Sequence, residues 1–293
     1  SNCMSSKSTV FMIAITSLCF TLCSFSFPGE TFILSAATVD TTIYKLVWSE
    51  EFNTPGPPDP SKWQFEKGLV RNEEHQWYQE ANAWCENGNL IIEGRKETRP
   101  NPYYKPDAKD WRSKRKEIYF SSSSINTAKS ATWLYGRFEM RGKIDINSGL
   151  WPAWWTLGVS EDWPANGEID IMEFYRGKLL ANIAFLDSNG KAAWYATERP
   201  VDSMGGKSWA EKFHVWRMDW DENAISLYVD DVLLNTVAMD KLHNRDASAK
   251  NPFKQKHYML LNLALGGING GSLENTRFPN RFEVDYVRVY QKQ

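Results

Sequence analysis

Hydrophobic and polar positions alternate along much of the chain in short runs. Successive side chains of a β-strand point to opposite faces, so each run predicts a strand with one buried face. The runs cover residues 44–48, 89–94, 133–143, 153–157, 168–174, 179–185, 213–220, 224–229, 258–264 and 282–290. Turn-forming residues separate them, and helical spacing predicts one short helix at 239–245. We therefore expect an all-β protein, a jelly-roll sandwich of two antiparallel sheets.

The run GEIDIMEF at residues 167–174 contains three acidic residues. By strict alternation Glu168 and Asp170 share one face of the strand, and the isoleucine after each points to the other. Glu173 falls on the wrong face unless one extra residue is accommodated in a β-bulge near residues 171–172. With such a bulge, the three carboxyl groups line one face.

A row of carboxyl groups suits the hydrolysis of glycosidic bonds. Retaining hydrolysis needs two carboxyls about 5–5.5 Å apart, one nucleophilic and one protonated. Neighbouring carboxylates raise each other's pKa, so one of them can keep its proton near neutral pH, and a third can share a proton with the nucleophile. Two other interpretations stay open: an edge strand with its acids in solvent, and an oxygen-rich cation site.

Aromatic residues precede the acidic strand. In a strand over residues 151–157, Trp151, Ala153 and Trp155 share a face, so two indoles lie on one side. An indole can stack on a sugar ring, and the 14 Trp residues make the chain unusually rich in such side chains. Filling the core is the alternative interpretation, and it is favoured for Trp154.

Composition narrows the class of protein. Hydrophobic residues make up 42% and charged residues 24%, as in ordinary globular proteins. The net charge of −2 offers no basic footprint, so we expect no nucleic-acid partner. No repeat or linker divides residues 38–293, which we expect to form one domain and a monomer. Cys85 is the single cysteine of that range and is expected to be a buried small hydrophobe rather than half of a disulfide.

Residues 1–37 have a different pattern. Lys7 precedes an uncharged apolar run at residues 10–27, which predicts an export signal, with small residues at Ser35 and Ala37 as a cleavage site. A membrane anchor helix and a lipoprotein signal at Cys23 are the alternatives. We expect a periplasmic, cell-surface or extracellular protein whose contact with a membrane is limited to a lipid anchor.

The acidic strand and five other segments carry a resemblance to a known family. Residues 167–173 resemble the active-site signature of glycoside hydrolase family 16 in its bulged, laminarinase-like form. The other similar segments, which together reach from Trp48 to Tyr290, are residues 48–52, 72–78, 135–141, 151–155 and 284–290. The resemblance implies a concanavalin-like β-jelly roll with a carbohydrate cleft on its concave sheet. It also implies endo-acting hydrolysis of a β-linked polysaccharide with net retention.

Residue roles follow from the same resemblance. It implies that Glu168 is the nucleophile, Glu173 the general acid/base and Asp170 the helper, with no cofactor for catalysis. A structural Ca²⁺ ion is expected at the closing strand, with Asp285 as a ligand. The expected substrate-binding residues, which bind sugar hydroxyls, stack on sugar rings or lie near the cleft, are Asn72, Gln76, Trp151, Trp155 and Arg137. An ion pair is the alternative role of Arg137.

Three features depart from the common laminarinase pattern. Residues 180–185 lack the histidine that many such enzymes carry, His75 is atypical, and residues 103–116 form a long insertion. These departures border the expected cleft, so they bear on the substrate rather than on the chemistry. We expect an exported enzyme that cleaves β-1,3- or mixed β-1,3/1,4-glucan. The alternatives are an endo-β-galactosidase acting on mucin O-glycans or other host or algal galactosides, and a sugar-binding protein without catalysis.

Overall fold

The computed structural model describes residues 44–293, so the expected export signal and Cys23 lie outside the described residues. The larger strands are β1 (Tyr44–Glu50), β5 (Asn89–Pro100), β6 (Glu117–Ser122), β8 (Gly136–Lys143), β9 (Leu150–Gly158), β10 (Glu168–Tyr175), β11 (Lys178–Leu186), β12 (Ala192–Pro200), β13 (His214–Trp220), β14 (Ala224–Val229), β15 (Val232–Ala238), β16 (His257–Leu265) and β17 (Asn280–Lys292). The short elements are β2 (Gln64–Phe65), β3 (Gln76–Tyr78), β4 (Ala83–Glu86), β7 (Ser124–Asn126), α1 (Lys207–Ala210) and α2 (Gly267–Gly270). In this part of the chain no helix has the length and apolarity needed to cross a membrane.

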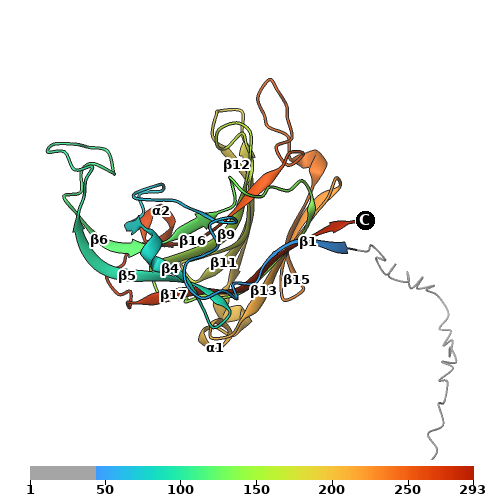
Figure 1. Cartoon of the computed structure of the whole chain (residues 1–293). Coiled ribbons are helices and arrows are strands. Elements are labelled where there is room, and N and C mark those ends of the chain that lie inside the picture. Colours follow the sequence, from blue (N-terminus) through green and yellow to red (C-terminus); the bar gives the residue numbers. More distant parts are fainter. Residues whose placement is uncertain (1–43) are drawn as a thin grey trace, which may run out of the picture. The chain divides into compact units, whose positions relative to one another are not determined.

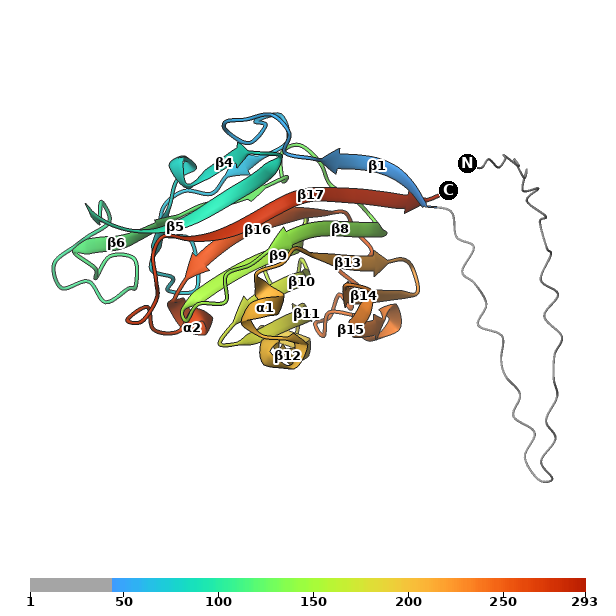
Figure 2. The same ribbon diagram turned by 90° about the horizontal axis from the view of Figure 1, so that it is seen from below.

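The strands form two sheets (Figures 1 and 2). One has the order β15-β14-β13-β8-β17-β5-β6-β3, with β1 on β17 and β4 on β5, and the other has the order β12-β11-β10-β9-β16-β7-β2. We call the first the ten-stranded sheet and the second the seven-stranded sheet. Among the described strands all pairs are antiparallel except β3 with β6. This architecture confirms the predicted all-β jelly roll.

The hydrophobic core lies between the sheets. Ile169 and Ile171 of β10 point into it, together with Trp154 of β9 and Trp216 of β13. All four are fully or almost fully buried, which removes their large apolar surfaces from water. Trp154 therefore has the core position that its alternation predicted. Cys85 is buried as well.

Each predicted strand overlaps one in the structure, but shorter and more polar strands were missed. β12 has an alternating sequence whose side chains are only partly buried, and β15 presents Val232 and Leu233 to solvent, so neither has a clear buried face. The predicted helix at residues 239–245 is reduced to a 3₁₀ turn at Met239–Lys241. Local spacing could not reveal that the following residues continue as an irregular loop.

Candidate active site

A β-bulge in β10 brings the three acids onto one face. Asp170 pairs with Asn182 of β11, and Glu173 pairs with Leu180, so three steps along β10 match two along β11. Pairing with β9 shows the same shift, between Asp170 and Met172. The extra residue reverses the alternation and returns Glu173 to the side of Glu168 and Asp170. The predicted bulge is confirmed.

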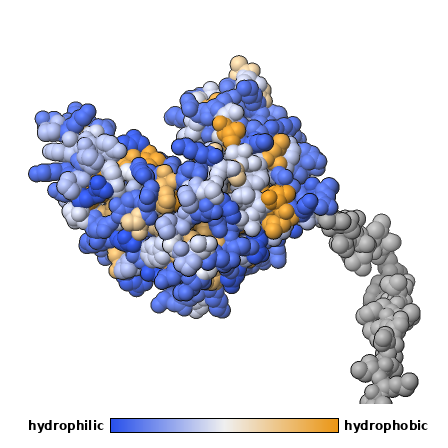
Figure 3. Space-filling view, viewed as in Figure 1, coloured by the Kyte–Doolittle hydropathy of each residue, from blue (hydrophilic) through white to orange (hydrophobic). Residues whose placement is uncertain are grey.

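The three carboxyls lie in a cleft of about 610 Å³ on the outer face of the seven-stranded sheet. Figure 3 shows the molecule hollowed between two arms. The cleft crosses β12, β11, β10, β9 and β16, and loops complete its walls. Besides the acids, its lining residues are Arg71, Asn72, Glu74, Trp151, Ala153, Trp155, Leu157, Trp163, Tyr175, Leu180, Asn182, Trp194, Ala196, Glu198, Asn262 and Asn269.

Burial dominates the electrostatics of the acids. Glu168, Asp170 and Glu173 are 9%, 5% and 8% exposed, so water stabilises their charged forms poorly. Burial raises the pKa of Glu168 to about 7, although a hydrogen bond with Asp170 and the positive charge of Arg71 oppose the shift. Burial and the charge of Glu168 raise the pKa of Glu173 to about 8. The pKa of Asp170 is raised well above its ordinary value, first by burial and then by its two acidic neighbours.

Hydrogen bonds from the cleft floor orient Glu173. The indole N–H of Trp151 donates to its Oε1 at 2.6 Å, and the amide of Asn182 donates to its Oε2 at 3.5 Å. A fixed carboxyl can deliver or accept a proton at a defined position on a bound substrate. The arrangement therefore supports a general acid/base at Glu173 on the same face as an ionisable Glu168.

A second buried network lies beside the acids. The indole N–H of Trp155 donates to Asn262 Oδ1 at 2.8 Å, and the Asn262 amide donates to the Tyr78 hydroxyl at 2.9 Å. The Tyr78 hydroxyl in turn lies 3.5 Å from Oε1 of Glu74, a cleft-lining carboxyl whose pKa burial raises to about 7. Arg71 reaches the same region, with its guanidinium carbon 5.2 Å from the centre of the Trp155 ring.

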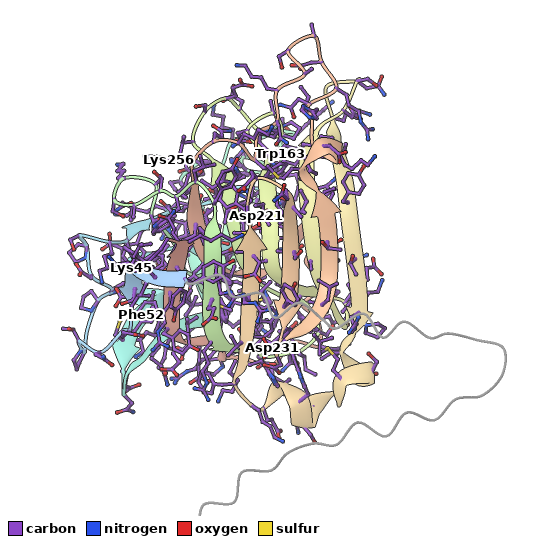
Figure 4. The ribbon with its side chains drawn as sticks, turned by 90° about the vertical axis from the view of Figure 1, so that its right-hand side faces the viewer. Lys45, Phe52, Trp163, Asp221, Asp231 and Lys256 are labelled. Carbon is purple, nitrogen blue, oxygen red and sulfur yellow. The ribbon has the colours of Figure 1, made fainter. Side chains whose placement is uncertain are left out.

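The expected sugar-binding tryptophans are less accessible than the sequence suggested. Trp151 and Trp155 line the cleft, but each is only 7% exposed because its ring packs into the floor. Larger aromatic surfaces come from two residues that the sequence did not single out, Trp163 at 51% and Trp194 at 48% exposed. In Figure 4 Trp163 lies near the upper ends of the strands, opposite the end that bears Asp231.

Two of the expected substrate-binding residues lie elsewhere. Asn72 lines the cleft as expected, but Gln76 is 1% exposed beneath it, where it donates to Glu74 and accepts from the backbone N–H of Leu265. A side chain that is almost completely buried and absent from the cleft lining cannot reach a sugar, so the expectation for Gln76 is wrong.

Arg137 also departs from its expected position near the cleft. It lies on β8 in the ten-stranded sheet, and its guanidinium donates to both oxygens of Asp219 at 2.7 and 3.0 Å. The sheet that carries the cleft is the other one, so the expectation of a cleft residue is wrong and the alternative ion pair is found.

The expected calcium ligand has a protein partner. Asp285 of β17 pairs with Arg141 at 2.8 Å. Across residues 44–293, no group of three or more His, Cys, Asp or Glu side chains could hold a metal ion. Because Ca²⁺ binds six to eight oxygens, the acidic side chains around Asp285 do not by themselves fit such an ion. Calcium stays a prediction from the resemblance, and no step of the chemistry depends on it.

Comparisons with known proteins agree with this geometry. The sequence model of "Glycosyl hydrolases family 16" matches residues 72–288. A β-glucanase of Rhodothermus marinus is 34% identical over 261 residues, which cover 85% of each chain. The catalytic domain of an endo-1,3-β-glucanase (laminarinase) from Thermotoga petrophila superposes with a TM-score of 0.72 and 32% identity, covering 86% of this chain and 99% of that one.

A third similar chain comes from a structural study of endo-acting O-glycanases that prominent human gut bacteria express to initiate mucin breakdown. It superposes with a TM-score of 0.76 and 31% sequence identity, and the superposition covers 85% of this chain and 91% of that one. The family match, the jelly roll and the carboxyl-lined cleft point the same way: the chain belongs to family 16 of the glycosyl hydrolases and is an endo-acting glycosidase.

Proposed function

We propose that this enzyme cleaves β-1,3- or mixed β-1,3/1,4-glucan with net retention of anomeric configuration. The observation that carries the proposal is the row of three nearly buried carboxyls, Glu168, Asp170 and Glu173, on one face of β10 inside the cleft. The β-glucanase and laminarinase relatives support the choice of glucan. The proposal includes export, based on the sequence of residues 1–37, and action as a monomer.

The roles of the acids are those implied by the resemblance of residues 167–173 to the family's active-site signature, and the hydrogen bonds that orient Glu173 support them. The ionised carboxylate of Glu168 attacks the anomeric carbon while protonated Glu173 gives its proton to the departing glycosidic oxygen. The bond to the leaving sugar breaks as an ester bond to Glu168 forms. Glu173, now ionised, takes a proton from water, and the hydroxide displaces the sugar from Glu168.

Asp170 lies between the two glutamates along the strand, and burial and its two acidic neighbours raise its pKa well above the ordinary value. Its hydrogen bond with Glu168 stabilises the carboxylate of that residue, which is otherwise costly in a site with little water. The same hydrogen bond assists the release of Glu168 as a leaving group in the second step. Asp170 thus supports the nucleophile without contacting the leaving sugar.

The shape of the cleft supports cleavage within a chain. It crosses five neighbouring strands, and strands lie about 4.8 Å apart, so the floor extends for roughly 20 Å. A floor of that length holds several linked sugars on both sides of the acids. Exposed faces of Trp163 and Trp194 at the rim offer stacking surfaces for these sugars.

One observation favours a second substrate class, the mucin O-glycans. The chain from the gut O-glycanase study superposes with a TM-score of 0.76, against 0.72 for the laminarinase, at a similar sequence identity. Under this alternative the chemistry of Glu168 and Glu173 is unchanged, and the enzyme acts as an endo-β-galactosidase. The presence of all three acids in the cleft argues against a protein that only binds sugars.

The test is a comparison of substrates with the purified protein. Laminarin, mixed-linkage glucan, agarose-type galactan and mucin glycans are each incubated with it, and the products are identified by mass spectrometry. We expect short oligosaccharides from laminarin or mixed-linkage glucan, and ¹H NMR of the first product should show the β-anomer. Products from mucin glycans alone would establish the second class, and initial release of the α-anomer would disprove retention. The Glu168→Gln variant controls for contaminating activity.

A further inference from the structure

The insertion that the sequence marked as atypical forms part of an arm beside the cleft. It follows β5, precedes β6, and projects at the left of Figure 1 as the loop of residues 101–116. Its base lies next to the segment of residues 69–74, which carries three residues of the cleft lining, Arg71, Asn72 and Glu74. We call residues 69–74 the wall segment.

Two arginines of the insertion hold the two ends of the wall segment. Arg112 donates through Nε to the carbonyl oxygen of Leu69 at 3.0 Å and through Nη2 to that of Val70. These two carbonyls directly precede Arg71. Hydrogen bonds from a charged donor are stronger than those between neutral groups, so one guanidinium fixes two consecutive peptide units.

Arg115 makes the matching contact at the other end. Its Nη1 donates to the carbonyl oxygen of Glu74 at 2.9 Å, and its Nη2 donates to that of Glu73 at 2.7 Å. The two guanidinium groups therefore bind the carbonyls on either side of Arg71 and Asn72, and they do not bind the carbonyls of these two residues themselves. Each guanidinium uses its planar fork to reach a pair of neighbouring oxygens, which a lysine ammonium cannot match geometrically.

The wall segment needs such support because its backbone is unusual. Asn72 and Glu73 have φ values of 57° and 54°, a left-handed conformation that costs non-glycine residues free energy and persists only where surrounding contacts fix it. The carbonyl of Asn72 accepts from the N–H of Ile268 at 2.9 Å, and that of Arg71 accepts from Glu74 N–H at 3.2 Å. With the arginine contacts, all six carbonyls of residues 69–74 have partners.

The insertion in turn fixes its own arginines. The side-chain amide of Asn101, which is 5% exposed, donates to the carbonyl oxygen of Arg112 at 2.7 Å and to that of Arg115 at 2.8 Å. One buried side chain thus sets the spacing between the two arginine backbones. Asn101 thus fixes the backbone of the two arginines, and the arginines fix the wall segment. The wall segment in turn places its side chains in the cleft.

We propose that Arg112 and Arg115 are positioning residues for polysaccharide binding, which hold Arg71 and Asn72 in the cleft through the wall-segment carbonyls. The inference rests on the proposed function in that the cleft binds a glycan. The arginines contact the wall segment and not β10, which carries Glu168 and Glu173. Their loss therefore weakens substrate binding more than it slows the chemical step.

The kinetic test compares Arg112→Ala, Arg115→Ala and Arg115→Lys with Lys114→Ala. Lys114 is an exposed residue of the same insertion, so its loss removes the same charge without removing a contact to the wall segment. We expect each alanine variant of an arginine to raise KM roughly tenfold, equivalent to about 1.4 kcal/mol, with kcat changed less than about threefold. Arg115→Lys should recover part of the loss. An unchanged KM, or equal effects in Lys114→Ala, would overturn the inference.

A second measurement does not depend on knowing the substrate. Hydrogen–deuterium exchange of peptides covering residues 69–75 is compared between the wild type and the same variants, with β10 peptides as the reference. Faster exchange of the wall segment in both arginine variants, with Lys114→Ala like the wild type, supports positioning even if no glycan is cleaved. If the wild type cleaves a glycan but exchange and KM are unchanged in the variants, the positioning role is disproved while the proposed function stands.

Discussion

β8 and β10 have similar alternating sequences, and the structure gives their polar faces opposite environments. In β8 the outward side chains Arg137, Glu139, Arg141 and Lys143 are all partly exposed. In β10 the acids that alternate with isoleucine are nearly buried. Each strand turns its apolar face to the same core, so the difference arises on the other side.

The contrast between β8 and β10 shows which surroundings make the polar face of a strand a catalytic site. On β8 each basic side chain has an acidic partner on a neighbouring strand: Arg137 with Asp219, Arg141 with Asp285, and Lys143 with Glu283. On β10 three acids lie side by side under loops and aromatic rims that reduce their contact with water. The charges on β8 are thus paired and partly exposed. The covered and crowded carboxyls on β10 have raised pKa values and hold their protons near neutral pH.

The largest expected difference between the faces is in turnover. Glu168→Gln should lower kcat by roughly 10³-fold or more, because an amide cannot attack the anomeric carbon, while substrate affinity is retained. Glu139→Gln makes the same change on the outer face of β8 and should leave kcat within about twofold of the wild type. Steady-state kinetics and calorimetric titration of substrate measure the two effects. Activity that survives in Glu168→Gln would disprove the assignment of the nucleophile.

The pH dependence of turnover should report the covered acids. The rate should rise with pH as Glu168 ionises, near pH 7, and fall as Glu173 loses its proton, near pH 8. We therefore expect a narrow bell-shaped profile of kcat/KM with its maximum between about pH 7 and 8, each limb approaching a tenfold change per pH unit. A profile that stays flat from pH 6 to 9 would contradict the pairing.

The same covered acids should make the fold sensitive to high pH. The pKa of Glu173 is about 8 in the folded protein, against about 4.3 when unfolded, so its contribution to stability is full below pH 4 and is lost as pH rises through 8. Glu173→Gln removes that loss. The free energy of unfolding of this variant, relative to that of the wild type, should therefore increase by about 5 kcal/mol between pH 4 and pH 9.

Urea denaturation at several pH values measures this change, with Glu139→Gln as the matched control. The control makes the same substitution at a partly exposed side chain. A difference between Glu173→Gln and the wild type that does not vary with pH would show that the carboxyl has the same pKa in the folded and unfolded protein.

The smallest effect is expected on the outer face. Arg137→Ala removes a partly exposed ion pair, so it should lower the free energy of unfolding by about 0.5–1 kcal/mol and leave kcat and KM unchanged. Thermal denaturation and kinetics on the preferred glycan measure both. A raised KM would show that the ten-stranded sheet takes part in substrate binding after all.

Local spacing was enough to predict most large strands and the acid row of the site. Alternation identified the inward faces, and Trp154 was predicted in the core. The bulge in β10 could be inferred because three acids on one face require an extra residue between Asp170 and Glu173. These features depend on neighbours along the chain, which is why the sequence reveals them.

Other site residues depended on contacts between distant parts of the chain. Trp194 lies on an alternating segment that could have been recognised as a strand, yet only the sheet order places it in the cleft. Arg71 precedes the recognised Asn72, but its place beside Trp155 arises from the folding of a loop. Gln76 and Arg137 were misplaced because a resemblance between segments does not say which layer or which sheet a polar side chain reaches in this chain.

The all-β class, the acid row and the family of the chain can be read from local patterns of residues. Packing between distant segments sets which polar face is covered, which tryptophans are exposed and which arginines support the wall segment. These properties lie beyond local patterns because proton affinity and accessibility depend on what packs over a side chain. At Glu168 and Glu173 the cover comes from adjacent strands and also from distant segments of the chain, the loop at Arg71 and the strand that bears Asn262.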